Sequence, residues 1–238
     1  MTRTPPTDAE PGRRYGDRTA AERSEDRRGR LVAAALEAFG TTGYGQTSIE
    51  QLCAQARVST RNFYELFAGR EALLLALHDD LNARALTAVA EAVAAVDPDD
   101  LPGRAGAGVR AYFTVVTSDR RWARIAIVES VGVSQTTERH RREAIQRFAD
   151  LLQLEFTRLA EAGLIPARDF RLTAIALVGA INGLVNTWAG DSAWDDSLDD
   201  VVAVATELIV TAATRPVVQV AAFGARRIAN SGAPHSGQ

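Results

Sequence analysis

Hydrogen-bonding side chains are concentrated in the stretch VSTRNFYELF, which spans residues 58–67. In order, the polar members are Ser59, Thr60, Arg61, Asn62 and Tyr64. In the major groove of DNA an arginine can pair with guanine and an asparagine with adenine. Hydroxyl groups of serine, threonine and tyrosine can bind phosphate oxygens. The stretch therefore has the residue types needed to read DNA, provided that neighbouring elements present them together.

Two short helices joined by a tight turn would present these side chains. The first is predicted over residues 47–55, with Thr47 as its N-cap and Glu50 completing a capping box. The second is predicted over residues 60–66, with Ser59 as its N-cap. Two helices with apolar faces and a turn of about three or four residues have the spacing of a helix-turn-helix.

The second of these helices has an apolar side as well as a polar start. Phe63 and Phe67 are four residues apart, so we expect them to share one face and to anchor the helix in the core. Tyr64 points about 100° away from that face. The first residues of such a second helix reach base edges, which makes Arg61 and Asn62 the leading candidates for reading bases.

Helical periodicity continues along most of the chain, and no stretch alternates as a strand would. A first helix ends at Gly40 and Gly43, and a long apolar-striped helix ends before Pro98. Further helices are predicted over residues 104–118, 120–131, 138–162, 169–189 and 197–214. The predicted class is all-α, with an N-terminal three-helix helix-turn-helix domain and a larger C-terminal helical domain.

Composition sets the predicted domain boundaries. Residues 1–25 combine Pro, Gly and alternating charge without apolar periodicity, which predicts a disordered arm. The arginines of this arm could enter a minor groove, or the arm could serve only as a solubilising tail. The helix-turn-helix domain is predicted over residues 26–71, the second helical domain over 72–214 and a C-terminal tail over 215–238.

The charge and the cysteine content bound the function classes. A formal net charge of −3 excludes a strongly basic protein, so any contact with DNA must be local. All 27 basic residues are arginine. The single cysteine, Cys53, excludes an intramolecular disulfide and fits a reducing cytoplasm. The sequence has no apolar run of about 18 residues, so no membrane span is predicted. No signal peptide is predicted either.

A helical enzyme is the alternative from another class, and the sequence gives it little support. The three histidines, His78, His140 and His235, do not have a metal-ligand spacing. No nucleophile elbow, phosphate-binding loop or dinucleotide fingerprint is present. We therefore predict no catalytic residue, no metal and no cofactor.

Residues 28–77, RGRLVAAALEAFGTTGYGQTSIEQLCAQARVSTRNFYELFAGREALLLAL, resemble the N-terminal domain of TetR-type (tetracycline-repressor-like) transcriptional regulators. The resemblance implies a homodimer that binds a double-stranded DNA operator, usually as a repressor, and is released by a small-molecule effector. It also implies roles for three residues. Thr47 resembles a helix cap that donates to a phosphate, Tyr64 the recognition-helix tyrosine on the DNA backbone, and Arg70 a basic residue at the start of the fourth helix.

Two positions depart from the family pattern. Arg57 stands in the turn where the family usually has glycine, so either its backbone is strained in the left-handed region or its side chain faces DNA. Leu66 stands where the family often has histidine, and Glu65 precedes it. A glutamate near phosphates is unfavourable unless it turns away or accepts from a cytosine.

The second domain mixes aromatic and polar residues on apolar helices, as a ligand pocket would. The candidate ligand-binding residues are Tyr112, Phe113, Trp122, Glu129, Phe148, Asn182, Asn186 and Trp188. Ordinary core packing is the alternative for each of them. Asn182 and Asn186 need hydrogen-bond partners if they are buried, and either a ligand or a second subunit could supply them.

The last two long helices resemble the pair that forms the family's four-helix dimer interface. Small residues would allow close approach there, and the candidates are Ala176, Gly179, Ala180 and Gly183. A further alternative is a regulator whose second domain binds a protein partner. A closed pocket together with an exposed apolar patch would favour that version.

Overall fold

The computed structural model describes residues 19–125, 133–190 and 197–215 of the 238-residue chain. Within these ranges the regular structure is helical and contains no strand, so the predicted all-α class is confirmed. In chain order the elements are α1 (Ala20–Thr41), the 3-10 turn η1 (Tyr44–Gln46), α2 (Ile49–Ala56), α3 (Thr60–Leu66), α4 (Arg70–Ala94), α5 (Leu101–Thr117), α6 (Arg120–Arg124), α7 (Gln135–Glu161), α8 (Arg171–Gly190) and α9 (Leu198–Thr214).

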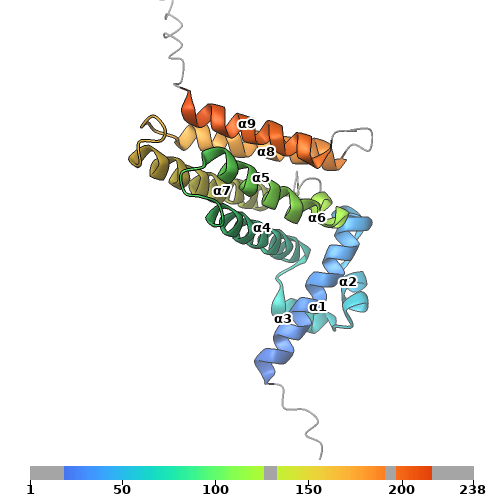
Figure 1. The fold of residues 1–238 in the computed structure, drawn as a ribbon. Coiled ribbons are helices and arrows are strands. Elements are labelled where there is room, and N and C mark those ends of the chain that lie inside the picture. The colour runs from blue at the N-terminus through green and yellow to red at the C-terminus, as the bar shows by residue number, and fades with distance from the viewer. Residues whose placement is uncertain (1–18, 126–132, 191–196, 216–238) are drawn as a thin grey trace, which may run out of the picture.

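The helices form a small head and a larger body (Figure 1). The head consists of α1, α2, α3 and the first half of α4, and the body extends from the second half of α4 to α9. The head has its own core, in which Leu31, Phe39, Leu52, Phe63 and Leu77 are fully buried. These residues come from four helices, so the position of α3 is fixed by apolar contacts on several sides.

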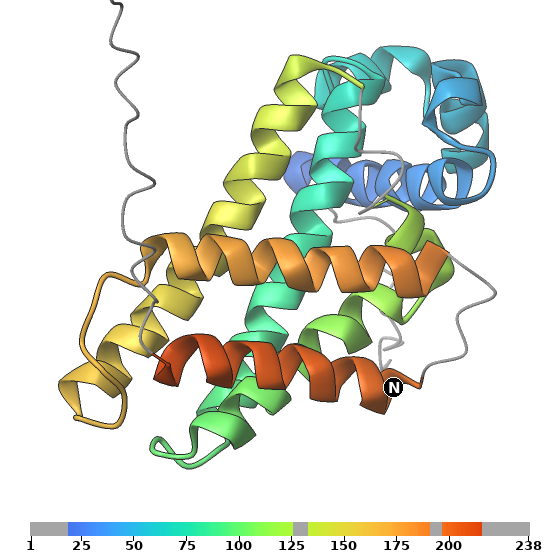
Figure 2. The ribbon, with the colours of Figure 1, turned by 90° about the horizontal axis from the view of Figure 1, so that it is seen from above.

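The body is built in layers of helices. Helix α5 packs between α4 and α9, and α7 packs against α8. Seen from above, α8 and α9 run antiparallel across the molecule and form its outermost layer, which Figure 2 shows in orange and red. The body core includes Phe113, Phe156, Phe170 and Ile209, which are contributed by α5, α7, α9 and the segment before α8.

Helix α4 belongs to both parts of the molecule. Its Leu73 and Leu77 are fully buried in the core of the head. About three to four turns beyond Leu77, its Val89 and Val93 line a cavity in the body. A straight helix is stiff over this length, so a movement of one half is transmitted to the other.

Helix α1 begins earlier than the sequence predicted. Residues 20–25 were expected to be part of a disordered arm, and the structure places them in α1. Thr19 is the N-cap: its hydroxyl accepts from the backbone N–H of Glu22 at 3.1 Å, and the Glu22 carboxylate accepts from the N–H of Thr19 at 2.6 Å. This capping box stabilises a polar first turn that has no apolar periodicity to reveal it. Residues 1–18 of the predicted arm lie outside the described residues.

The cap of α2 is one residue later than predicted. Ser48, and not Thr47, is the N-cap, and Gln51 rather than Glu50 completes its capping box. Thr47 with Glu50 and Ser48 with Gln51 both fit the sequence pattern of a capping box. The packing of Thr47 decides between them. The Thr47 side chain is 2% exposed, and its hydroxyl donates to the Gly43 carbonyl at 2.8 Å.

Most other predicted bounds agree with the structure within a few residues, and α3 matches the predicted residues 60–66. The helix predicted over 120–131 is seen only as α6, and residues 126–132 lie outside the described part of the chain. The predicted tail follows Arg215, the C-cap of α9, and lies outside it as well. Among the described helices, none is long and apolar enough to cross a membrane.

Candidate DNA interface and ligand cavity

Helix α3 presents a polar face to solvent and buries its apolar face. Ser59 is its N-cap as predicted, and its hydroxyl accepts from the backbone N–H of Asn62 at 3.2 Å. Phe63 is fully buried, whereas Tyr64 is 56% exposed, with the two rings in edge contact at 5.4 Å between centroids. The packing therefore leaves the Tyr64 hydroxyl free to reach outward, as the sequence predicted.

Three of the polar residues at the start of α3 lie on the same outer face, whereas Asn62 is half-buried. Ser59, Thr60 and Arg61 are exposed, and the Arg61 side chain retains 89% of its accessible surface. Its Nε lies 3.2 Å from Oε1 of Glu65, one turn further along the helix. Such an exposed pair is worth at most about 1 kcal/mol, so the guanidinium can exchange Glu65 for a base or a phosphate.

The turn between α2 and α3 contains the departure noted at Arg57. Arg57 adopts φ 53° and ψ 48°, the left-handed conformation that glycine accepts without strain. The guanidinium of Arg30, on α1, donates to the carbonyls of Ala56 and Arg57 at 3.1 and 3.2 Å. The Arg57 side chain is exposed beside α3. Both consequences that the sequence left open are thus present, a strained backbone and a side chain free to face DNA.

Replacing Arg57 with glycine should stabilise the head by about 1 kcal/mol, because the left-handed conformation then costs nothing and the backbone carbonyl bonded by Arg30 remains. Urea unfolding followed by circular dichroism would measure the gain. Arg57→Ala is the matched control, since it removes the guanidinium but keeps the Cβ that causes the strain. An equal gain in both variants would show that the strain is not the cause.

Two of the residues that resemble phosphate contacts are engaged inside the head. Thr47 is buried and its hydroxyl is bonded to Gly43, so the expected phosphate contact of Thr47 is not supported. Arg70 begins α4, and its Nη1 donates to the carbonyls of Tyr44 and Thr47, with its guanidinium 4.8 Å from the Tyr44 ring. Arg70 therefore holds the connection between α1 and α2, and a phosphate contact from its remaining N–H groups stays a prediction.

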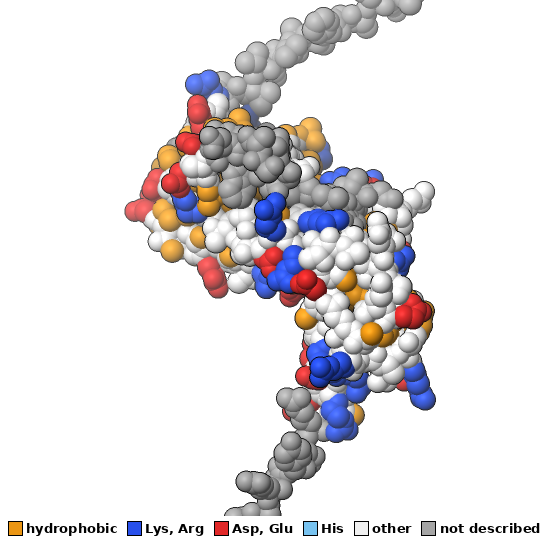
Figure 3. Space-filling view, turned by 90° about the vertical axis from the view of Figure 1, so that its right-hand side faces the viewer, with side chains coloured by type: hydrophobic (Ala, Val, Ile, Leu, Met, Phe, Trp, Pro, Cys, Tyr) orange, Lys and Arg blue, Asp and Glu red, His pale blue; other side chains and the backbone are white. Residues whose placement is uncertain are grey.

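Several arginine side chains lie at the lower end of the head. Figure 3 shows them as blue side chains near the start of α1.

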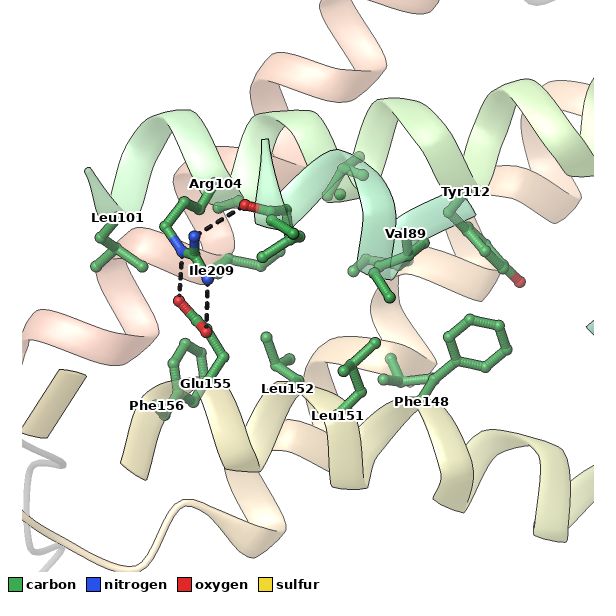
Figure 4. Close-up of a pocket in the computed structure, with 18 of the residues that line it drawn as sticks. Val89, Leu101, Arg104, Tyr112, Phe148, Leu151, Leu152, Glu155, Phe156 and Ile209 are labelled. Carbon is green, nitrogen blue, oxygen red and sulfur yellow. Dashed lines mark hydrogen bonds and ion pairs between the residues drawn. The ribbon is translucent and has the colours of Figure 1, made fainter. Parts of the chain in front are cut away.

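The body contains an apolar cavity of about 300 Å³ between α4, α5, α7, α8 and α9. Its wall includes Val89, Val93, Val109, Leu152 and Ile209. Figure 4 shows an ion pair at one end of this cavity and the rings of Tyr112 and Phe148 at the other. A concave, largely apolar space with a few polar groups is the usual form of a small-molecule site.

The ion pair at the end of the cavity joins Arg104 of α5 to Glu155 of α7. Their two contacts measure 2.6 and 3.0 Å, and the side chains are 10% and 20% exposed. Arg104 also donates to the carbonyls of Val93 and Val96 at the end of α4. Burial by itself raises the pKa of Glu155, but hydrogen bonds from Arg104 and Arg158 outweigh it and hold the pKa below its usual range.

A second cavity of about 140 Å³ adjoins the first, since both are lined by Tyr112, Phe148 and Asn182. The Tyr112 hydroxyl donates to Oδ1 of Asn182 at 2.6 Å. The wall of the second cavity is more polar and includes His78, Asn82, Arg141 and Asn186. Tyr112 and Asn182 therefore stand at the junction between an apolar and a polar compartment.

The structure brings together four of the eight predicted ligand-binding residues, namely Tyr112, Phe148, Asn182 and Asn186. Two of the predicted residues line neither of these cavities. Phe113 is fully buried in the body core and lines neither cavity. Trp122 packs into the core of the head, with the guanidinium of Arg84 over its ring at 4.7 Å.

The remaining two, Glu129 and the Trp188 side chain, lie outside what the structure describes. Sequence reasoning also missed Arg104 and Glu155. A signal for them existed: Arg104 is two helical turns before Tyr112, and Glu155 is three residues after Leu152, so each charge falls on an apolar face.

The predicted dimer face is exposed in the single subunit. Ala176, Gly179, Ala180 and Gly183 are all exposed on α8. A Cβ added at Gly179 or Gly183 would have nothing within 4 Å. Nearby on the same outer layer, Leu172, Val204 and Leu208 are 66%, 49% and 43% exposed. The α8–α9 surface thus offers apolar side chains beside small residues.

A second connection joins the head to the body through α6. The guanidinium of Arg121 bonds both Glu37 of α1 and Asp119, and Nη1 of Arg124 donates to the Thr41 carbonyl at 2.7 Å. Helices α1 and α6 lie close together here: a Cβ added at Gly40 would be only 2.4 Å from the Cβ of Arg121. The orientation of the head thus depends on α6 as well as on α4.

Comparisons with known proteins agree with this architecture. Residues 31–77 match the family model described as bacterial regulatory proteins, tetR family. The HTH-type transcriptional regulator EthR of Mycolicibacterium smegmatis is 30% identical over 158 residues, which are 65% of this chain and 72% of that protein.

Solved structures share the fold. A crystal structure described as a TetR-family transcriptional regulator from Syntrophomonas wolfei matches with a TM-score of 0.70 and 19% identity, over 82% of this chain and 98% of that one. The regulator FadR from Bacillus subtilis, in complex with stearoyl-CoA, matches with a TM-score of 0.66 and 19% identity, over 77% and 96%.

These relatives are transcriptional regulators, so the alternative of a helical enzyme falls away. The helix-turn-helix region, the all-helical body and the relative that is 30% identical lead to one conclusion. This chain belongs to the TetR family of bacterial transcriptional regulators.

Proposed function

We propose that this regulator is a homodimeric repressor that leaves its DNA operator when a small molecule enters the cavity of the body. The observation that carries the proposal is the placement of α4. Its first half lies in the core of the head, which presents α3, and its second half forms a wall of the cavity. A ligand that favours one position of α4 therefore favours one position of the head.

On the DNA side, each subunit places the start of α3 in a major groove. Arg61 and Asn62 are the proposed base-reading residues, with Thr60 beside them, and Tyr64 contacts the backbone. The exposure of Thr60, Arg61 and Tyr64 supports these roles, and Asn62 is half-buried beside Arg61. Two heads read half-sites about 34–36 Å apart, or a multiple of that distance. A protein with this role works where the DNA is, in the cytoplasm.

The α8–α9 surface supplies the dimer contact in this proposal. Two copies would pack their α8 and α9 helices as a four-helix bundle, with Gly179 and Gly183 allowing close approach. The exposed Leu172, Val204 and Leu208 would then be covered. The alternative, in which the second domain binds a protein partner, has less support for two reasons. The dimer contact would already use the apolar surface, and the body contains a cavity for a small molecule.

The first test is DNA binding to the upstream region of the protein's own gene, measured across a salt series. Wild type should bind specifically and more weakly as salt rises, because phosphate contacts release counterions. Tyr64→Phe should lose affinity to a similar extent on all sequences, by about 0.5–1.5 kcal/mol. Arg61→Ala should lose discrimination at one base pair, by about 1–3 kcal/mol.

Arg139→Ala is the matched control for Arg61→Ala. Arg139 forms the same kind of exposed pair with a glutamate four residues on, at 3.9 Å from Glu143, but on α7 in the body. It should leave DNA affinity unchanged. If wild type binds neither its upstream region nor any sequence selected from random DNA, the proposed function is wrong.

A further inference from the structure

The charged groups around the two cavities are already paired. At one end of the apolar cavity, Arg104 uses its guanidinium on Glu155 and on two backbone carbonyls, and Glu155 also accepts from Arg158. In the polar compartment Arg141 makes two contacts with Glu138, at 2.8 and 3.1 Å. Each of the charged residues described in the walls of the two cavities, Arg104, Glu155 and Arg141, therefore already has a partner of opposite charge.

His78, which also lines the polar compartment, is neutral at pH 7. Its side chain is 6% exposed, and burial, followed by the neighbouring His140, lowers its pKa to about 4. Nδ1 of His78 is 2.9 Å from the amide nitrogen of Asn82. Since Asn82 donates there, the ring proton belongs on Nε2. His78 therefore presents a neutral ring to the cavity.

Unused hydrogen-bonding capacity is concentrated at the junction of the compartments. The Tyr112 hydroxyl donates to Asn182 and can still accept. The Asn182 amide group makes no other hydrogen bond to the described residues. Burial raises the pKa of Tyr112, which keeps the phenol protonated. The junction thus offers a neutral donor and a neutral acceptor within an otherwise apolar wall.

The two compartments follow one another along the same helices. His78 and Val93 of α4 line opposite compartments, and so do Arg141 and Phe156 of α7. Each pair is fifteen residues apart, which corresponds to about 22 Å along a helix at 1.5 Å per residue. The available space is therefore elongated, with Asn182 and Tyr112 away from the end that holds Arg104 and Glu155.

We propose that the effector is an uncharged, linear, amphipathic molecule whose alkyl chain fills the apolar cavity and whose head group binds at the junction, its carbonyl oxygen accepting from the Asn182 amide and its N–H donating to the Tyr112 oxygen. Amides with an extended alkyl chain have this chemistry. An ionised head of the same size would have to be buried at the junction without a partner, at a cost of several kcal/mol. The proposal rests on the function above and specifies the chemistry of its effector.

The test uses three soluble probes with the same eight-carbon chain: octanamide, octanoate and octylammonium. Calorimetric titration of the full-length protein at pH 7 should give octanamide an affinity at least about tenfold higher than that of either ion, a difference of about 1.4 kcal/mol. Asn182→Leu, which keeps the side-chain size, should lower octanamide affinity about tenfold, in line with the loss of one buried hydrogen bond. Tyr112→Phe should lower it to a smaller extent.

Thr114→Val is the matched control, since it removes an exposed hydroxyl from the same helix, α5, and should leave octanamide binding unchanged. Thermal unfolding of each variant without probe shows whether it is folded. Tighter binding of an ion, unchanged octanamide affinity in a folded Asn182→Leu variant, or no binding of any probe would each overturn the proposal.

Measuring DNA binding distinguishes a failure of the effector proposal from a failure of the proposed function. If wild type binds its operator but no neutral probe, the regulator stands and the effector chemistry is wrong. If octanamide binds through Asn182 but no DNA sequence is bound, the effector chemistry stands and the repressor function is wrong.

Discussion

Replacing Arg104 with methionine should lower the free energy of unfolding by about 3–5 kcal/mol, the usual cost of removing one partner of a buried ion pair. The change leaves the Glu155 carboxylate largely buried, with only Arg158 beside it. It also removes the donor that bonds the carbonyls of Val93 and Val96 at the end of α4. Chemical unfolding at a fixed protein concentration would measure the loss, since a dimer's stability depends on concentration.

The double variant Arg104→Met, Glu155→Leu is the control for this experiment. Replacing a whole buried ion pair with apolar residues is often neutral, so the double variant should regain most of the lost stability. The part of the stability that the double variant does not regain corresponds to the carbonyls of Val93 and Val96, which have lost their donor. If both variants lose the same amount, the loss comes from packing rather than from an unpaired charge.

Introducing glutamates at Gly179 and Gly183 should convert the proposed dimer into monomers and lower operator affinity at least about hundredfold. Each subunit has room for the new side chains, because an added Cβ meets nothing within 4 Å at either position. The substitutions should therefore destabilise the contact between the two copies and not the single subunit. In the dimer, the new glutamates of both copies would be buried close to one another, and their like charges would repel. Linking two reading heads raises avidity by about 10²–10⁴, and that gain is lost in a monomer.

Light scattering coupled to size-exclusion chromatography measures the mass, and a gel-shift titration measures operator affinity. Leu154→Glu is the control, because it also places a glutamate on an exposed position, 68% exposed, but on α7. It should leave a dimer with unchanged operator affinity. A Gly179→Glu, Gly183→Glu variant that remains dimeric would show that the subunits associate through another surface.

The helix-turn-helix could be predicted from sequence almost residue by residue, because local rules fix it. Ser59 caps α3 as expected, and Phe63 is buried while Tyr64 is exposed, as a helical period of 3.6 requires. The error at Thr47 shows where local rules end. Thr47 and Ser48 both satisfy the capping rule, and only the packing of Thr47 against the Gly43 carbonyl selects Ser48.

The cavity was predicted less well, because it depends on contacts between distant segments. Tyr112 and Phe113 are adjacent aromatics about 100° apart on α5, and which of them faces the cavity depends on how α4 and α9 pack on that helix. Arg104 and Glu155 are 51 positions apart, so their pairing is invisible to any local pattern. Trp122 has the residue type of a pocket, yet it lies in the head because α6 packs against α1.

The sharing of α4 between head and body has a consequence for the operator as well as for the effector. Binding at two sites that bias one helix is reciprocal: if the effector weakens operator binding by a given factor, the operator weakens effector binding by the same factor. Under the proposed function, DNA-bound protein would therefore bind the effector more weakly than free protein. The concentration of effector that induces the gene would then depend on how many operators and how much non-specific DNA compete for the heads, and one protein could set different thresholds at different promoters.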